Sequence, residues 1–249
     1  MRAPLPVMTH AQRTARAQAK AEILLKFLGS GEVYTTADIA SSLLQIDRSR
    51  AAACLKSLEQ AGALKSEAHE VRARVTKLFG ITPHGLALAG CFDNPHFELG
   101  RTNPSWITHR LATQRMRIAA EAAGWTDWTP ERAILNQGLK LKKVPDAAAT
   151  DPAGRRVAVE IERHCKTPKR YSEIIVAYLL EIKAGRYQEV HYVCPTGTEK
   201  LIEKSFSRIE SVKFNGEVVK LEAKHRARFK FFSFDTWPPV PAKSEAANG

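Results

Sequence analysis

The segment 144–166 constrains the fold more than any other stretch of the chain. Asp146 precedes a first short apolar run, and Glu160 lies within a second one. The Asp-Pro-Ala-Gly sequence at 151–154 separates the two runs, and these residue types are typical of a tight turn. Two short apolar runs joined by a turn predict a β-hairpin, so the chain is expected to hold paired strands that carry carboxylates.

Length, charge and cysteine usage limit the class of protein. The chain has 249 residues, of which 44% are hydrophobic and 26% are charged, so one large domain or two modest ones can form a core. A formal net charge of +12 favours a polyanionic partner such as nucleic acid. The four cysteines form no CxxC pair, and no apolar run has the length of a membrane span. We therefore expect a cytoplasmic protein with no membrane partner.

The N-terminal part of the sequence predicts helices around a tight turn, followed by two strands. Helical spacing of apolar residues covers 9–27, 37–43 and 48–60, and strand patterns cover 63–65 and 71–81. Thr35 or Thr36 can cap the second helix, and Asp47 or Ser49 the third. This order resembles that of winged helix-turn-helix domains, which we predict for residues 1–90.

Basic residues gather on the two elements of a winged helix that normally meet DNA. In the strand that begins at Val71, alternation predicts Arg72 and Arg74 on the exposed face and Ala73 and Val75 on the other. The candidate contacts to double-stranded DNA are Arg48, Ser49, Arg50, Lys56, Arg72, Arg74 and Lys77. The alternative is that these side chains are only solvated, as in a winged helix that binds other proteins.

The remainder of the chain predicts a linker, a second domain and a tail. Residues 91–104 contain prolines and turn residues with little periodicity, so we expect a linker. Residues 105–237 alternate helical and strand patterns, which gives a mixed α+β or α/β fold class. Residues 238–249 are rich in proline, then in small and polar residues, and are expected to be a disordered tail.

The order helix, strand, hairpin, helix, strand in this second domain resembles PD-(D/E)xK restriction-endonuclease-like domains, which have an α-β-β-β-α-β core. The residues that resemble the family's sequence motif are Asp146 with its preceding proline, and Glu160-Ile-Glu162. It implies that Asp146 and Glu160 hold Mg²⁺ or Mn²⁺, an ion that activates water and stabilises phosphorane charge. The family has lysine where this chain has Glu162, and Lys166 or Lys169 can supply the missing ammonium. The catalytic candidates, if the domain is active, are Asp146, Glu160, Glu162 and Lys166.

Further short motifs resemble the replication-relaxation family of plasmid and mobile-element proteins, which also carries an N-terminal winged helix. The motifs are His109-Arg-Leu-Ala, Gly124-Trp125 with Trp128 and Glu131, Pro145-Asp-Ala, and Val159-Glu-Ile-Glu followed by Lys166 and Arg170-Tyr171. The resemblance implies a DNA-binding accessory protein of plasmid mobilisation, conjugation or replication, with a nuclease-like domain. A relaxase or other relaxosome proteins are the implied partners. Glu131 is either a further acidic ligand or a solvated glutamate at a helix N-terminus.

Other interpretations remain open at this stage. Glu162 stands where a cation is wanted, which favours an inactive nuclease-like domain over an active Mg²⁺-dependent endonuclease. A protein-interaction adaptor without nucleic-acid binding is a further alternative. A homodimer is a further alternative, for which the helix at 9–27 is the candidate contact. Zinc at His164, Cys165, His191 and Cys194 is less favoured, because Cys194 lies within an apolar strand and buried free cysteine is common.

The phenylalanines of 229–234 alternate within a predicted strand. Aromatic rings in such a strand can stack on nucleic-acid bases or pack into a core, and we predict core packing.

Overall fold

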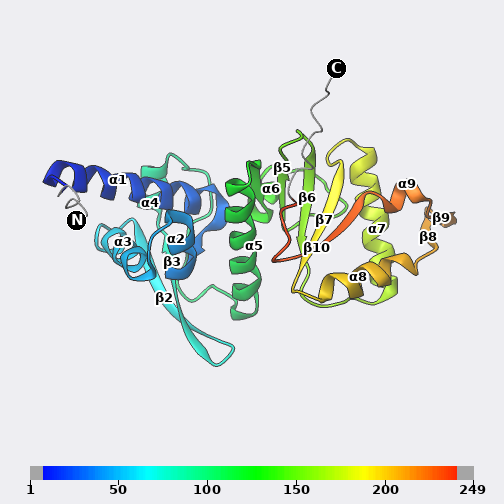
Figure 1. Cartoon of the computed structure of the whole chain (residues 1–249), viewed down its shortest axis with the longest axis horizontal. Coiled ribbons are helices and arrows are strands. Elements are labelled where there is room, and N and C mark those ends of the chain that lie inside the picture. Colours follow the sequence, from blue (N-terminus) through cyan, green and yellow to red (C-terminus); the bar gives the residue numbers. More distant parts are fainter. Residues whose placement is uncertain (1–7, 240–249) are drawn as a thin grey trace, which may run out of the picture. The chain divides into compact units, whose positions relative to one another are not determined.

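In the computed structural model, which describes residues 8–239, helices and strands form a mixed α+β fold (Figure 1). The chain divides into two units, Met1–Leu111 and Ala112–Gly249, and helix α5 (Pro104–Ala122) runs across this division. Most of the tail that we expected to be disordered, 240–249, lies outside the described residues, as do residues 1–7. None of the helices within 8–239 combines the length and the apolar character needed to cross a membrane.

The first unit contains a three-stranded antiparallel sheet in the order β1-β3-β2. Its elements are α1 (His10–Phe27), a π-turn η1 (Leu28–Glu32), β1 (Tyr34–Thr35), α2 (Ala37–Leu44), α3 (Arg48–Gln60), β2 (Leu64–Val71), β3 (Arg74–Ile81) and α4 (Pro83–Ala89). Polar side chains begin the helices: Thr36 accepts the Ile39 amide in α2, and Asp47 accepts the Arg50 amide in α3. Gln45, in the left-handed region at φ 53°, ends α2 and allows the tight turn into α3.

The β2–β3 hairpin is longer than the sequence predicted and corrects the expected alternation. Arg72 and Ala73 form the turn with φ of 50° and 56°, and Val71 pairs with Arg74. Arg72 therefore does not lie on a strand face beside Arg74. Val75, which we expected on the face opposite the cations, is 80% exposed. The hairpin projects from the helices of its unit (Figure 1), and residues 72–75 at its tip are exposed.

Residues 91–104, which we expected to be a linker, pack against the first unit. Phe97 is 2% exposed, its amide donates to the Ile81 carbonyl at 2.8 Å, and its ring meets Tyr34 edge-on. The ring lies directly on the backbone of Gly80, where an added Cβ would sit 1.9 Å from it. Only glycine fits there, so β3 and this irregular segment form one packed structure.

The second unit is built on a five-stranded mixed sheet in the order β10-β7-β6-β5-β4. Neighbours among β4, β5 and β6 are antiparallel, whereas β7 is parallel to both β6 and β10. The strands are β4 (Thr126–Pro130), β5 (Ala147–Thr150), β6 (Arg156–Ile161), β7 (Glu189–Cys194) and β10 (Phe229–Ser233). The helices are α6 (Glu131–Asn136), α7 (Pro168–Lys183), α8 (Thr198–Ser207) and α9 (Ala223–Arg226). The predicted hairpin is thus β5–β6, with its turn at 151–154.

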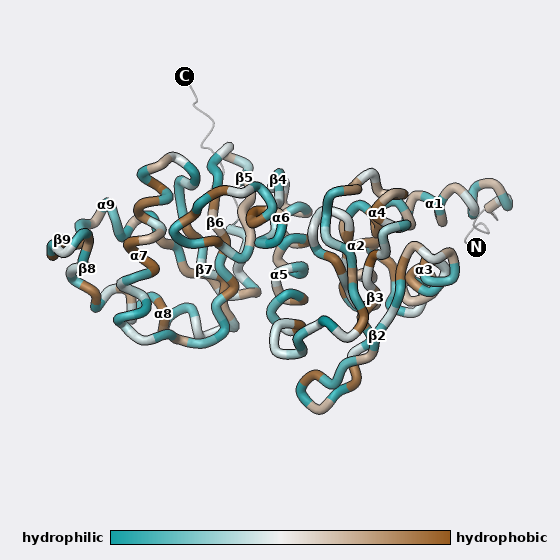
Figure 2. Tube along the Cα trace, turned by 180° about the vertical axis from the view of Figure 1, so that it is seen from behind, coloured by the Kyte–Doolittle hydropathy of each residue, from teal (hydrophilic) through white to brown (hydrophobic). Residues whose placement is uncertain are grey.

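Apolar side chains cover both faces of this sheet. One core joins Ala158 and Tyr192 to Tyr178 of α7 and Phe206 of α8. The other core holds Val157, Val159 and three tryptophans, Trp125, Trp128 and Trp237. Hydrophobic and hydrophilic residues alternate along α7 (Figure 2), as expected for a helix with one face on a sheet.

The final strand and one unexpected hairpin complete the unit. Phe229 and Phe231 pack in the first core and Phe232 and Phe234 in the second, which confirms the prediction of core packing for 229–234. A separate antiparallel pair, β8 (Ser211–Phe214) and β9 (Glu217–Lys220), was not predicted. It lies beside α7.

Candidate functional site

The register of β5 and β6 brings Asp146 and Glu160 together. Ala147 lies opposite Val159, so the residue before β5 and the residue after Val159 are neighbours across the two strands. The Asp146 carboxylate accepts the Ile161 amide at 2.7 Å, which fixes it against the end of β6. The two carboxylates are close enough for the charge of Asp146 to raise the pKa of Glu160.

Glu160 is a buried carboxylate, 6% exposed, with two protein donors on one oxygen. Lys143 Nζ lies 2.6 Å from Oε1, and the Tyr178 hydroxyl of α7 donates to the same atom. Burial, and then Asp146, raise the pKa of Glu160, while Lys143 and the Tyr178 hydrogen bond oppose the shift. The buried carboxyl is therefore held in place by the protein's own cation and hydroxyl.

Glu162 and Lys166 form a second charged pair just beyond β6. Glu162 is 8% exposed and is ion-paired with Lys166. Burial lowers the pKa of Lys166, and the charges of Glu160 and Asp146 partly offset this. The Lys166 amide donates to the Tyr171 hydroxyl at 3.0 Å, which fixes the loop before α7. The ammonium that sequence reasoning assigned to Lys166 does lie near the carboxylates, but its ion-pair partner is Glu162.

Lys143, Tyr178 and Glu181 are site residues that sequence reasoning missed. Glu181 of α7 is fully buried and accepts the Lys142 amide at 2.6 Å, which ties the loop before β5 to the helix. That tie places Lys143 over Glu160. The signal in the sequence was a lysine pair, 142–143, directly before the proline and Asp146. Tyr178 follows Tyr171 by seven residues, a spacing that puts both on one helical face.

The donor set does not fit a divalent cation as it is arranged. Asp146 and Glu160 are the carboxylates that approach one another, and Glu160 already accepts from Lys143 and Tyr178. Glu131 reaches this region through its amide, which donates to the Asp146 carbonyl at 2.9 Å. Across residues 8–239, no group of three or more His, Cys, Asp or Glu side chains could hold a metal ion. Mg²⁺ or Mn²⁺ at Glu160 would lie beside the Lys143 ammonium, which contacts Oε1 of this carboxylate.

The predicted DNA contacts on α3 lie at the surface, and the two arginines among them form weak ion pairs. Arg48 pairs with Asp38 at 2.8 Å and Arg50 with Asp47 at 3.1 Å, while the two arginine side chains stay 71% and 76% exposed. The Ser49 hydroxyl donates to Asp47. Lys56 is exposed on the same helix. Ion pairs between exposed side chains contribute little free energy, so these cations can exchange partners at low cost.

The predicted contacts on the hairpin differ in how they are held. Lys77 is tied down, 3.6 Å from Glu59 and 4.7 Å above the Phe79 ring. Arg72 and Arg74 are exposed at the tip, and neither has an ionic partner among the described residues. The structure therefore offers two sets of exposed cations in the first unit, one on α3 and one at the tip of β2–β3.

The four residues considered for zinc, all of them described by the structure, do not gather into a metal-binding group. His164 and Cys165 are exposed, whereas His191 and Cys194 are buried in β7. His191 lies 3.1 Å from Glu189 and accepts the indole N–H of Trp237 at 3.2 Å. Burial raises the pKa of the Cys194 thiol to about 12, so this thiol is neutral and part of the core.

No protein-family model, curated protein or solved structure matches the chain. Function is therefore inferred from the residues and their geometry.

Proposed function

We propose that this protein is a DNA-binding accessory protein of plasmid or mobile-element mobilisation or replication, with a nuclease-like second unit that does not cleave DNA. The observation that carries the proposal is the exposure of the cations on α3 and at the β2–β3 tip. Exposed cations on neighbouring elements attract DNA phosphates and release counterions on binding. The proposed protein partners are a relaxase or other relaxosome proteins.

The arrangement of the first unit supports a winged helix. Helices α2 and α3 flank a tight turn, and an antiparallel hairpin follows them, which is the order of helix-turn-helix and wing. In such domains α3 is the helix that enters the major groove. Arg48 and Arg50 begin α3, and Arg72 and Arg74 occupy the tip of the wing. The left-handed turn at Arg72 and Ala73 is strained for non-glycine residues, a feature often kept for function.

The arrangement of the second unit supports a nuclease-like core without cleavage. Three antiparallel strands, a helix and a parallel fourth strand follow the order of PD-(D/E)xK domains. Two observations argue against cleavage: Glu162 stands where that family has lysine, and Lys143 neutralises Glu160. We propose that this unit contributes backbone contacts or a protein surface instead.

A gel-shift experiment at low salt in EDTA tests DNA binding. The full chain is expected to retard a short duplex, and Asp146→Ala is expected to leave that shift intact. A variant with Arg48, Arg50, Arg72 and Arg74 changed to alanine is expected to lose most of it. The matched control removes four exposed lysines of the second unit, Lys200, Lys204, Lys213 and Lys220. Absence of any shift by the unaltered chain, or an equal loss in the control, would overturn the proposal.

An active metal-dependent endonuclease is the second candidate, and one observation favours it. Lys166 feels the charges of Glu160 and Asp146, so a cation does lie near the two carboxylates. Incubation of supercoiled plasmid with Mg²⁺ or Mn²⁺ separates the two candidates. Nicking that disappears in Glu160→Ala would establish the endonuclease. Absence of nicking, or nicking of equal strength in Glu160→Ala, would leave the non-cleaving protein.

A further inference from the structure

A cavity of about 470 Å³ lies in the second unit between α7 and the β8–β9 hairpin. Val176, Leu179 and Ile182 line it from the helix, and Phe214 and Val219 line it from the hairpin. Val176, Leu179 and Ile182 also pack against the core that contains Tyr178, but the residues that line the cavity include neither Tyr178 nor Glu181. The cavity has a largely apolar wall, and neither Asp146 nor Glu160 lines it.

Every charged side chain that lines the cavity is basic. Lys183, Lys224 and Arg228 lie among the lining residues with His225, and no carboxylate does. Lys224 is paired with Glu222 at 2.8 Å, but both side chains are more than half exposed, so the pair is weak. Lys183 ends α7 without an ionic partner among the described residues. An anion in the cavity would meet at least one unengaged ammonium.

We propose that this cavity binds a small amphipathic anion, with a rigid apolar body and a single carboxylate, sulfonate or phosphate group. The volume falls in the range of small-molecule pockets, roughly 300–1,000 Å³. The apolar wall from α7 and the hairpin would remove the ligand body from water, and Lys183 would hold its charge. This ligand site is inferred from residues of the second unit alone and does not depend on whether the first unit binds DNA.

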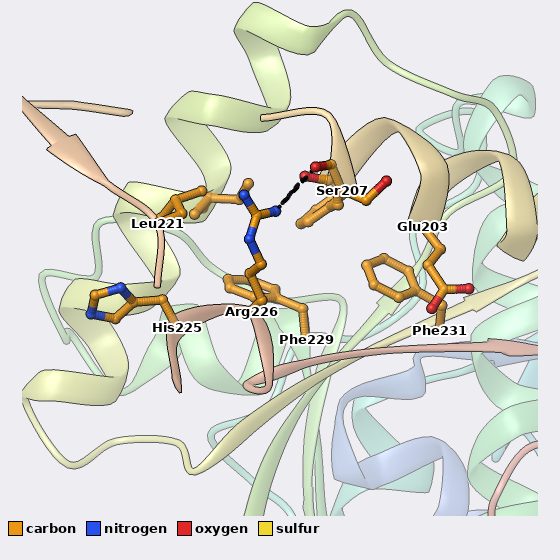
Figure 3. Close-up of a pocket in the computed structure, with 9 residues that line it drawn as sticks. Glu203, Ser207, Leu221, His225, Arg226, Phe229 and Phe231 are labelled. Carbon is orange, nitrogen blue, oxygen red and sulfur yellow. Dashed lines mark hydrogen bonds between the residues drawn. The ribbon is translucent and has the colours of Figure 1, made fainter. Parts of the chain in front are cut away.

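The neighbouring pocket shown in Figure 3 does not offer the same chemistry. It shares Leu221 and His225 with the larger cavity, but its volume is only about 160 Å³. Its arginine, Arg226, already donates to the carbonyls of Phe206, Ser207 and Ile209. Glu203 also lines it and would repel an anion. The charged end of a ligand is therefore assigned to the Lys183 side of the larger cavity.

Anilinonaphthalene sulfonate, which has an apolar body and one sulfonate, is a suitable probe. We expect the folded chain to bind one equivalent saturably, and N-phenylnaphthylamine, a similar body without charge, to bind more weakly. Lys183→Gln is expected to weaken binding of the sulfonate about threefold to fivefold, as for an exposed ionic contact. It should leave binding of the neutral compound unchanged. Lys213→Gln is the matched control, because Lys213 is exposed on the same hairpin but does not line the cavity.

Two adjacent valines of β9 locate the bound probe. Val219 lines the cavity and Val218, 68% exposed, does not. Val219→Trp should fill the space and weaken binding about tenfold or more, whereas Val218→Trp should leave it unchanged. Circular dichroism of each variant checks that the fold is kept. Non-saturable binding to the unaltered chain, or equal effects of the two tryptophan variants or of the two lysine variants, would overturn the proposal.

Discussion

The charged groups of the two units are held in opposite ways. In the first unit Arg48 and Arg50 stand more than 70% exposed on α3, with carboxylate partners that are themselves at the surface. In the second unit Glu160 is 6% exposed and already accepts from Lys143 and Tyr178. Exposed charges are free to bind another molecule, whereas buried charges that satisfy one another mainly hold a structure in place. For this reason we propose that the first unit binds DNA and that the second unit does not cleave it.

Removal of Lys143 tests the buried side of this comparison and has the largest expected effect. Lys143→Met leaves the Glu160 charge buried without its cation, so we expect a loss of about 3 kcal/mol in unfolding free energy at neutral pH. Urea denaturation measures it. Adding Glu160→Gln removes the buried charge and is expected to restore most of the stability. No loss in Lys143→Met would mean that the pair is not formed.

The same pair predicts a pH dependence. The pKa of Glu160 is raised in the folded state, so its contribution to stability is present at low pH and is lost as pH rises through that pKa. Lys143→Met removes a group that lowers this pKa, so the variant should lose more stability than the parent between mildly acidic and neutral pH. Parallel urea titrations across this range measure the difference. Glu160→Gln should abolish it.

Neutralising the exposed cations tests the proposal that the first unit binds DNA. Changing Arg48, Arg50, Arg72 and Arg74 to alanine removes up to four phosphate contacts. We expect DNA affinity to fall on the order of 100-fold near physiological salt, and the slope of log K against log salt to fall by about four. Fluorescence anisotropy of a labelled duplex measures both. The unfolding free energy should barely change, in contrast with Lys143→Met.

Removal of the N-cap of α3 is expected to have a smaller effect on stability. The cap side chain, Asp47, orders the start of the helix but is exposed. Asp47 accepts the Arg50 amide at 2.9 Å, and Asp47→Ala should cost about 1 kcal/mol of stability. Asp47→Ser retains a capping oxygen and should cost much less. Thermal denaturation of the two variants makes the comparison. Equal losses would show that the charge of Asp47, rather than its cap, stabilises α3.

A substitution in the β2–β3 turn is expected to have the smallest effect, and it should raise stability rather than lower it. Ala73 has φ of 56°, so Ala73→Gly should stabilise the chain by about 0.5 kcal/mol. Ala68→Gly, at an exposed position in the middle of β2, should instead destabilise it. Thermal denaturation measures both. DNA affinity should be unchanged in Ala73→Gly, unless the strained turn itself presents Arg72 to DNA.

The sequence predicted local structure well where one pattern determined the outcome. The β5–β6 hairpin and the bounds of α3 followed from apolar periodicity, turn residues and caps. The alternation at 71–76 failed because the turn itself occupies Arg72 and Ala73. The packing of Phe97 on Gly80 was missed, because irregular backbone carries no periodic signal of burial.

The candidate site was predicted only in part for a related reason. Asp146 and Glu160 are close in sequence to one turn, so their pairing follows from the hairpin register. Lys143 reaches Glu160 through the contact between Lys142 and Glu181, 39 residues away, and Tyr178 comes from the next helix. These contacts depend on how α7 packs on the sheet, which local patterns do not specify.

A native gel of supercoiled plasmid incubated with the full chain and Mg²⁺ tests the central contrast most directly. One half of the sample is loaded intact, and the other after digestion of the protein. We predict that the intact sample is retarded and that the digested sample is fully supercoiled, because the first unit binds and the second does not cut. An unretarded plasmid, or nicked product that is absent with Glu160→Ala, would contradict this account.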